Sequence, residues 1–175
     1  MRDTTISTDH VTLSVVSLIC SLVHRVPQDF VPQLVSAIRG HDCAENLREM
    51  IACDLEARGK LIATLNMILM QDGPSNVAVV DKIFSSPQVS TVFQQLLESS
   101  CSRVLSASCM LLGHATRVRA SFIGKLNNLE DLLSELINLE TNPNNDVQSA
   151  AKYASSQIMK NKIYKRKMQE NDCML

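Results

Sequence analysis

A ten-residue pattern occurs three times along this chain, and its spacing is the feature that most restricts the possible fold. The segment "RVLSASCMLL" at residues 103–112 resembles "KLIATLNMIL" at residues 60–69 and "DVQSAAKYAS" at residues 146–155, each time at an offset of 43 residues. The segments before them also match, because the apolar residues of 89–97 align with those of 129–137 at an offset of 40. Two neighbouring segments that repeat in register indicate a repeat architecture.

The repeated segments have the periodicity of amphipathic helices. Apolar residues recur at steps of three and four in residues 11–23, 92–97 and 129–137. The sequences "QDGPSN" at 71–76 and "TNPNND" at 141–146 are rich in loop-forming residues, and each precedes a new apolar run. The chain holds only five Gly and five Pro in 175 residues, which is too few for the many turns of an all-β protein. The sequence therefore predicts an all-α fold.

The repeats resemble the armadillo/HEAT family of helical repeats. Residues 117–158 resemble one complete armadillo unit, with a short first helix in "ASFIGKLNN", a second in "LEDLLSELINLE" and a long third helix rich in small residues in "DVQSAAKYASSQI". Residues 75–115 resemble the unit before it, and residues 45–69 resemble the last part of an earlier one. The resemblance covers roughly residues 45–162 and implies a right-handed α-solenoid.

The expected organisation is one repeat domain between two tails. In such a solenoid each unit has an apolar face that it cannot bury alone, so the units stack and the third helices line a concave face. The expected parts are a polar N-terminal tail at 1–10, a repeat domain at 11–162 and a basic and polar C-terminal tail at 163–175; the repeat domain divides into an N-terminal helical cap at 11–44 and about three repeats at 45–74, 75–116 and 117–162.

The resemblance also identifies residues that are expected on the concave face. Armadillo proteins of nuclear import carry Trp and Asn four residues apart on each third helix, where they hold an extended peptide. The aligned positions here hold Asn66, Cys109 and Lys152 in place of Trp, and Met70, Gly113 and Ser156 in place of Asn. Since the Trp and Asn ladder is absent, nuclear-import cargo is not expected. The softer surface favours a partner helix or a short apolar motif, while packing between units is the alternative role for Asn66 and Cys109.

The sequence gives little support to catalysis or metal binding. Cys109 falls in the middle of a predicted helix with no evident base beside it, and no phosphate-binding glycine loop or zinc-protease motif occurs. Cys20 and His24 are four residues apart, and His41 and Cys43 flank Asp42, but a structural zinc site needs four ligands in paired spacings. We therefore expect no enzyme activity, no small-molecule substrate, no cofactor and no metal.

Composition restricts the compartment and the membrane topology. Six scattered Cys without a C-x-x-C pair, and an N-terminus that does not resemble a signal peptide, favour reduced thiols in the cytoplasm or nucleus. The longest apolar stretch, residues 11–26, is broken by serines and a histidine, so no membrane span is expected.

The end of the chain is basic. The sequence "KNKIYKRK" at 160–167 fits a nuclear localisation signal, a contact with an anionic surface, or a solvated helix end. Its cations are Lys160, Lys162, Lys165, Arg166 and Lys167. A net charge of −1 and an aromatic content of 3% argue against nucleic-acid binding as the main role. Leu175 is only a poor match to a C-terminal ligand of PDZ domains, because Cys173 stands where Ser or Thr is usual.

These features together predict a non-enzymatic adaptor or scaffold that binds a helix or short motif of another protein on the concave third-helix face. Two alternatives stay open at this point. One is a homo-oligomeric structural subunit, because the open ends of a short solenoid expose apolar surface. The other is a subunit of a nuclear or nucleic-acid-associated complex that uses the basic tail.

Overall fold

The computed structural model describes residues 8–25, 29–30, 32–33, 55–71, 73–84 and 88–172, with their side chains except at 8–16, 75 and 162–172. The regular structure in these ranges is helical, and no β-strand occurs among them, which confirms the prediction of an all-α protein. None of the described helices combines the length and the apolar character that crossing a membrane requires.

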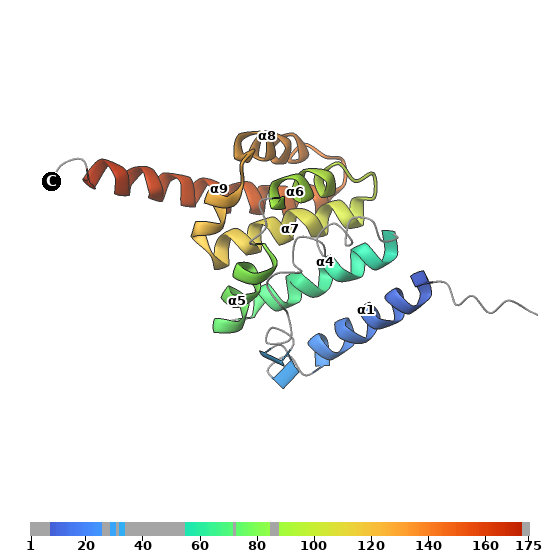
Figure 1. The fold of residues 1–175 in the computed structure, drawn as a ribbon. Coiled ribbons are helices and arrows are strands. Elements are labelled where there is room, and N and C mark those ends of the chain that lie inside the picture. Colours follow the sequence, from blue (N-terminus) through green and yellow to red (C-terminus); the bar gives the residue numbers. More distant parts are fainter. Residues whose placement is uncertain are drawn as a thin grey trace, which may run out of the picture.

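Four long helices form one layer of the molecule. They are α1 (Thr8–Arg25), α4 (Leu55–Met70), α7 (Ser102–Val118) and α9 (Asn145–Asp172). They lie side by side in this order, so that α4 packs between α1 and α7, and α7 packs between α4 and α9 (Figure 1). The three similar ten-residue segments lie within α4, α7 and α9. The offset of 43 residues is therefore the separation along the chain of neighbouring helices in this layer.

Shorter helices form the second layer. They are α5 (Pro74–Ile83), α6 (Val89–Leu97), the 3₁₀ helix η2 (Ala120–Lys125) and α8 (Leu129–Leu139). Helix α6 packs on α7, α8 packs on α9, and α6 and α8 also contact each other (Figure 1). The segments that match at an offset of 40 residues thus form the two helices α6 and α8, which we call the outer layer.

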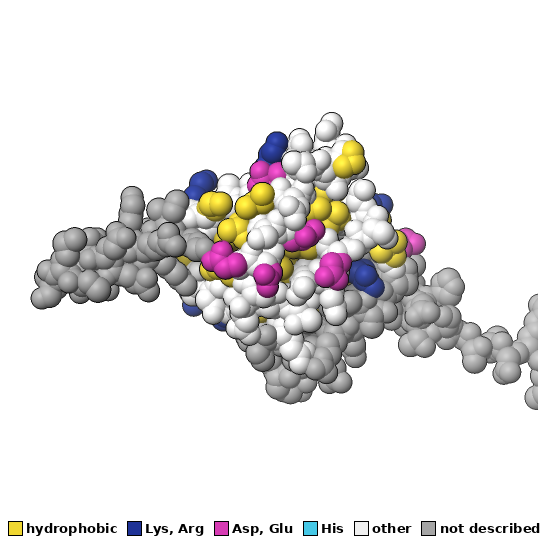
Figure 2. Space-filling model, turned by 90° about the horizontal axis from the view of Figure 1, so that it is seen from above, with side chains coloured by type: hydrophobic (Ala, Val, Ile, Leu, Met, Phe, Trp, Pro, Cys, Tyr) yellow, Lys and Arg dark blue, Asp and Glu magenta, His cyan; other side chains and the backbone are white. Residues whose placement is uncertain are grey.

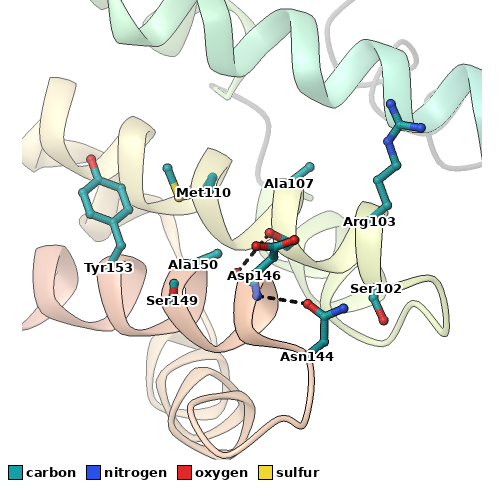
Figure 3. A pocket seen from close by; sticks show the side chains of 10 residues that line it. Ser102, Arg103, Ala107, Met110, Asn144, Asp146, Ser149, Ala150 and Tyr153 are labelled. Carbon is teal, nitrogen blue, oxygen red and sulfur yellow. Dashed lines mark hydrogen bonds between the residues drawn. The ribbon is translucent and has the colours of Figure 1, made fainter.

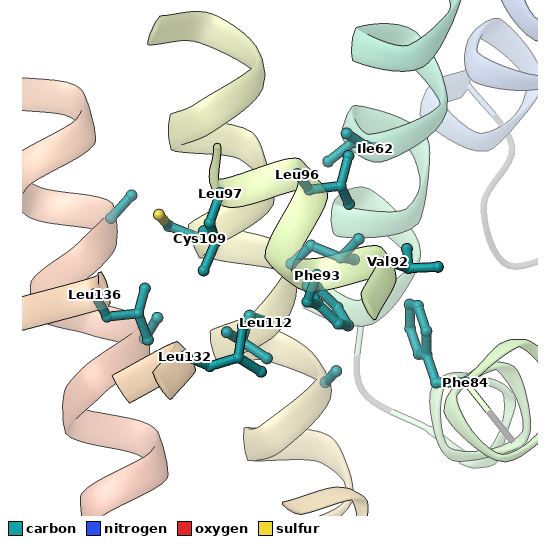
Figure 4. Close-up of a cluster of buried hydrophobic side chains, with 14 of the residues drawn as sticks. Ile62, Phe84, Val92, Phe93, Leu96, Leu97, Cys109, Leu112, Leu132 and Leu136 are labelled. Carbon is teal, nitrogen blue, oxygen red and sulfur yellow. The ribbon is translucent and has the colours of Figure 1, made fainter. Parts of the chain in front are cut away.

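Buried apolar side chains fill the space between the layers (Figure 4). Three of the four Phe residues meet here, with ring centroids 5.6 Å apart for Phe84 and Phe93, 5.7 Å for Phe84 and Phe122, and 5.9 Å for Phe93 and Phe122. All three rings are fully buried. Because Phe84 follows α5, Phe93 belongs to α6 and Phe122 belongs to η2, the cluster ties three short elements together. Each such pair adds about 0.5–1.5 kcal/mol to the free energy gained from burial of the rings.

Local sequence signals explain two of the helix starts. Gly73 has a φ of 142°, which side chains disfavour, and Pro74 follows it in the first turn of α5, where a missing N–H costs no hydrogen bond. Before α9, Asn144 Oδ1 accepts hydrogen bonds from the backbone N–H groups of Asp146 at 3.0 Å and Val147 at 3.2 Å. This arrangement is the usual cap of a helix N-terminus.

Polar side chains also join neighbouring long helices. Lys60 Nζ donates to Ser17 Oγ at 3.1 Å, which links α4 to α1. Ser106 Oγ donates to the carbonyl oxygen of Asp146 at 3.2 Å, and Asn161 Nδ2 donates to the carbonyl oxygen of Thr116 at 3.3 Å; both bonds link α7 to α9. These contacts fix the register of one long helix against the next, which apolar packing alone leaves less defined.

The outer layer is acidic. Seen from above the view of Figure 1, acidic and hydrophobic side chains gather over the middle of this face (Figure 2). Helices α6 and α8, with the residue that follows each, contain no Lys or Arg. Their acidic residues are Glu98, Glu130, Asp131, Glu135 and Glu140.

Candidate binding face

Two of the three residues in the first predicted row, Asn66 and Cys109, pack within the layer of long helices. Asn66 Nδ2 donates to the carbonyl oxygen of Ala107 at 2.8 Å, so it joins α4 to α7. The equivalent Cys109 is fully buried among the core side chains (Figure 4). Lys152 is exposed on the last long helix, where no further described helix follows. The expectation that Cys109 contacts a partner is therefore corrected, because this position serves packing between neighbouring helices.

The second predicted row is only partly accessible. Met70 is 61% exposed at the end of α4. Gly113 is buried, and a Cβ placed on it would lie 2.6 Å from the ring of Tyr153, so this glycine provides the seat for that ring. Ser156 is half-buried and donates from Oγ to the carbonyl oxygen of Tyr153 at 2.8 Å. Gly113 is thus covered by Tyr153, which corrects the expectation for this residue, whereas a role of Met70 and Ser156 in partner binding stays a prediction.

An open groove of about 850 Å³ runs between α7 and α9 (Figure 3). Small and polar side chains form most of its wall, and Met110 and Tyr153 lie at one end of it. Arg103 stands at the other end, where its side chain extends towards α4 (Figure 3). The lining residues are Ser102, Arg103, Ser106, Ala107, Met110, Asn144, Asp146, Ser149, Ala150 and Tyr153.

A second groove of about 670 Å³ lies between α1, α4 and the start of α7. Arg103 lines this groove as well, so the two grooves meet at its side chain. Neither groove has a lining residue from α6 or α8, which places both on the long-helix face, the surface formed by α1, α4, α7 and α9. The lining residues are Ser17, Cys20, Ser21, Leu55, Glu56, Gly59, Lys60, Ala63, Cys101, Arg103 and Val104.

Equivalent positions, related by the 43-residue offset, line the two grooves. Ala63, Ser106 and Ser149 occupy one equivalent position on α4, α7 and α9, and all three are small and line a groove. Met110 and Tyr153 share another position, one residue after the predicted Cys109 and Lys152. One residue corresponds to a rotation of about 100° around a helix, which is the difference between facing the groove and facing the next helix.

Tyr153 packs against side chains of α7. Its hydroxyl lies 3.0 Å from Nδ1 of His114, and the two ring centroids are 5.1 Å apart. Burial, helped by the nearby Arg117, lowers the pKa of His114 to about 4, so this imidazole is neutral at pH 7. Burial also raises the pKa of Tyr153, although Arg117 opposes the shift. The contacts keep Tyr153 in one orientation at the edge of the groove.

Arg117 connects this edge to the neighbouring helix. Its Nη2 donates to the carbonyl oxygen of Leu69 at 2.9 Å, near the exposed Met70. An Arg that caps the last carbonyl groups of a helix is stabilised by the helix dipole. Met70, Arg117 and Tyr153 therefore stand together at one edge of the long-helix face.

Two of the candidate chemistries considered from the sequence can be compared with the described side chains. Burial raises the pKa of the Cys109 thiol to about 12, so this sulfur is protonated and a poor nucleophile at pH 7. Within the described ranges, no group of three or more His, Cys, Asp or Glu residues is placed to hold a metal ion. His41 and Cys43 lie outside the described residues.

The basic tail is described only in part. Lys160 is exposed on α9, and the helix continues through Lys162, Lys165, Arg166 and Lys167, whose side chains lie outside the description. Leu175 also lies outside the described residues. The role of the tail stays a prediction.

No known family model matches this chain, and a search of curated proteins finds no significant sequence match to it.

Proposed function

We propose that this chain is a non-enzymatic binding module of armadillo-like architecture, which holds a peptide or helix of another protein on its long-helix face. The observation that carries the proposal is the pair of grooves that meet at Arg103. Open grooves that border two or three helices suit an extended polypeptide better than a small molecule, whose sites are usually enclosed.

The two-layer arrangement supports the solenoid part of the proposal. In an armadillo-like reading, α4, α7 and α9 are the third helices of three units, α6 and α8 are second helices, and α5 and η2 are first helices. Helix α1 packs on α4 as the next long helix of the layer and would belong to the N-terminal cap. Equivalent helices then recur at the sequence period, as a stack of similar units requires.

The free side of the last long helix weighs against stacking of a second copy there. This side carries the polar Gln148 and Lys152 and one exposed apolar residue, Met159. Terminal units of a solenoid need such a polar surface to end the stack. Among the described side chains of α9, only Met159 is a large apolar residue exposed to solvent, and one such residue does not make an apolar face that would drive self-association, so we favour a separate protein as the partner.

Two matched variants on α9 test the proposal. Ser149 and Lys152 are both exposed, but Ser149 lines the groove and Lys152 lies outside it. Ser149→Trp fills the groove and should abolish recovery of the partner in a quantitative pull-down from cell extract, while Lys152→Trp should leave recovery unchanged. Equal recovery by both variants would place the partner elsewhere and contradict the proposal. Circular dichroism of both variants controls for folding.

A further inference from the structure

The charges on the long-helix face follow a definite order. Lys60, Arg103 and Asp146 occupy equivalent positions on α4, α7 and α9, and all three line the grooves. Two cations therefore lie side by side over α4 and α7, and an anion follows over α9. The small residues Ala63, Ser106 and Ser149 form the next row along the helices. Met110 and Tyr153 lie beyond that row.

Arg103 is available to an external anion. It is exposed, it lines both grooves, and no carboxylate of the described residues forms an ion pair with it. Lys60 does have partners, since its Nζ lies 2.9 Å from Glu56 Oε1 on the same helix and donates to Ser17 Oγ on α1 at 3.1 Å. An ion pair between residues four apart on one helix contributes only about 0.3–0.5 kcal/mol, so a bound carboxylate can replace Glu56 at little cost while Lys60 keeps its hydrogen bond to Ser17.

The outer layer has the opposite character. Its five acidic residues are not balanced by any Lys or Arg on α6 or α8. An acidic partner is repelled from α6 and α8, whereas the grooves of the long-helix face offer it Arg103 and Lys60, with the carboxylates of Glu56 and Asp146 beside them. This difference in charge favours the long-helix face as the binding site and an acidic segment as the partner.

We infer that the partner segment is an extended acidic peptide, which crosses the long helices with carboxylates over Lys60 and Arg103 and apolar side chains towards Met110 and Tyr153. The inference rests on the proposed function and adds the chemistry of the partner. Packed helices are about 8–10 Å apart and an extended chain advances about 3.3 Å per residue, so neighbouring carboxylates should be about three residues apart. Asp146 adds a preference for a basic residue on the α9 side of these carboxylates.

A peptide fits this face better than a nucleic acid. Glu56 and Asp146 lie beside the two cations in the grooves, and they would repel a continuous phosphate backbone. A peptide can place its charges singly and match the order of cation, cation and anion. A single-stranded oligonucleotide, which is also negatively charged, is therefore the alternative ligand to compare with the peptides.

The test selects peptides with the full chain from a displayed library of random twelve-residue sequences, and counter-selects with Ser149→Trp. Enriched peptides should carry a net negative charge, with acidic residues about three apart. Their affinity, measured by fluorescence anisotropy, should fall at least about tenfold in Arg103→Glu and stay within twofold of the unmodified chain in Lys152→Glu. The same peptides should also bind several-fold more weakly when NaCl rises from about 50 to 500 mM.

Other outcomes overturn the inference. Peptides that are enriched but neutral or basic, or that bind Arg103→Glu as well as the unmodified chain, would refute the acidic partner while the proposed binding face stands. A twelve-nucleotide single strand that binds more tightly than the peptides, and is lost in Arg103→Glu, would replace the peptide by a nucleic acid. If no peptide is enriched over the Ser149→Trp background, the inference and the proposed function fall together.

Discussion

The ring of Tyr153 on α9 lies directly over Gly113 on α7, and the two helices approach closely because Gly113 has no side chain. A Cβ at this position would lie 2.6 Å from one ring carbon, 2.7 Å from another and 3.1 Å from the Cα of Ala154. The contact joins α7 to the side chain of Tyr153, which forms one end of the α7–α9 groove. Packing between the two helices and the shape of the groove therefore depend on the same pair of residues.

We predict that Gly113→Ala destabilises the protein, since the ring or the backbone of α9 must move to accept the methyl group. The free energy of unfolding should fall by about 1–3 kcal/mol, the usual cost of overpacking, despite the better helix propensity of Ala. Urea denaturation followed by circular dichroism measures the change.

Gly59→Ala is the control for this prediction. Gly59 also lies within a long helix, but its added Cβ would meet only Val104 Cγ2 at 3.8 Å, an ordinary contact. This variant should be as stable as the unmodified chain or more stable by up to about 1 kcal/mol. If both substitutions changed stability equally, the close approach of Tyr153 would not be the reason.

The neutral state of His114 predicts that stability depends on pH. Burial lowers the pKa of His114 in the folded protein from 6.5 to about 4, so the unfolded chain binds more protons between these values. This contribution to stability is complete above pH 6.5 and is lost as the pH falls towards 4, with a total on the order of 2–3 kcal/mol. Urea denaturation at several pH values should show a weaker dependence in His114→Gln than in the unmodified chain. Parallel profiles in this range would contradict the buried, neutral imidazole.

The cysteines should differ in reactivity. Cys20 and Cys101 are half-buried beside a groove, whereas Cys109 is fully buried with a pKa of about 12. Brief treatment of the folded protein with iodoacetamide at pH 8 should alkylate Cys20 and Cys101 and leave Cys109 unmodified. Peptide mass spectrometry identifies the modified sites, and the same treatment in concentrated urea should modify all three. Rapid alkylation of Cys109 in the folded state would show that it is accessible.

The phenylalanine cluster should be the most sensitive part of the core. Phe93 contacts both Phe84 and Phe122, so Phe93→Ala removes two ring contacts and leaves a cavity. The expected loss in the free energy of unfolding is about 3–5 kcal/mol. Phe93→Leu, which corresponds to Leu133 at the equivalent position of α8, should cost clearly less. Equal costs would mean that the lost ring contacts, and not the lost side-chain volume, determine the change in stability.

Much of the helical architecture could be predicted from the sequence, because amphipathic periodicity and the 43-residue offset depend on local pattern alone. The offset placed the three similar segments on α4, α7 and α9, which the structure confirms as helices. The orientation of each helix could not be predicted equally well. Small residues of the kind found at Ser106 and Ala107 suit both a close helix contact and the floor of a groove.

The candidate site shows where this ambiguity matters. An alignment to a repeat pattern placed Cys109 on the concave face, yet the groove is lined by the next residue, Met110. Only the packing of α7 against its neighbours decides between these two positions, because they are one residue apart on the same helix. The seat of Tyr153 on Gly113 also could not be predicted, since it joins residues of two helices 40 positions apart.

Site-specific photo-crosslinking in cells tests the central claim most directly. A photoreactive phenylalanine derivative replaces Ser149, which lines the groove, or Gln95, which is exposed on the outer-layer helix α6. The account predicts that a partner protein is cross-linked from position 149 and not from position 95, and that Arg103→Glu reduces the yield at 149. A partner cross-linked from position 95 and not from 149 would contradict the proposal that the long-helix face is the binding face.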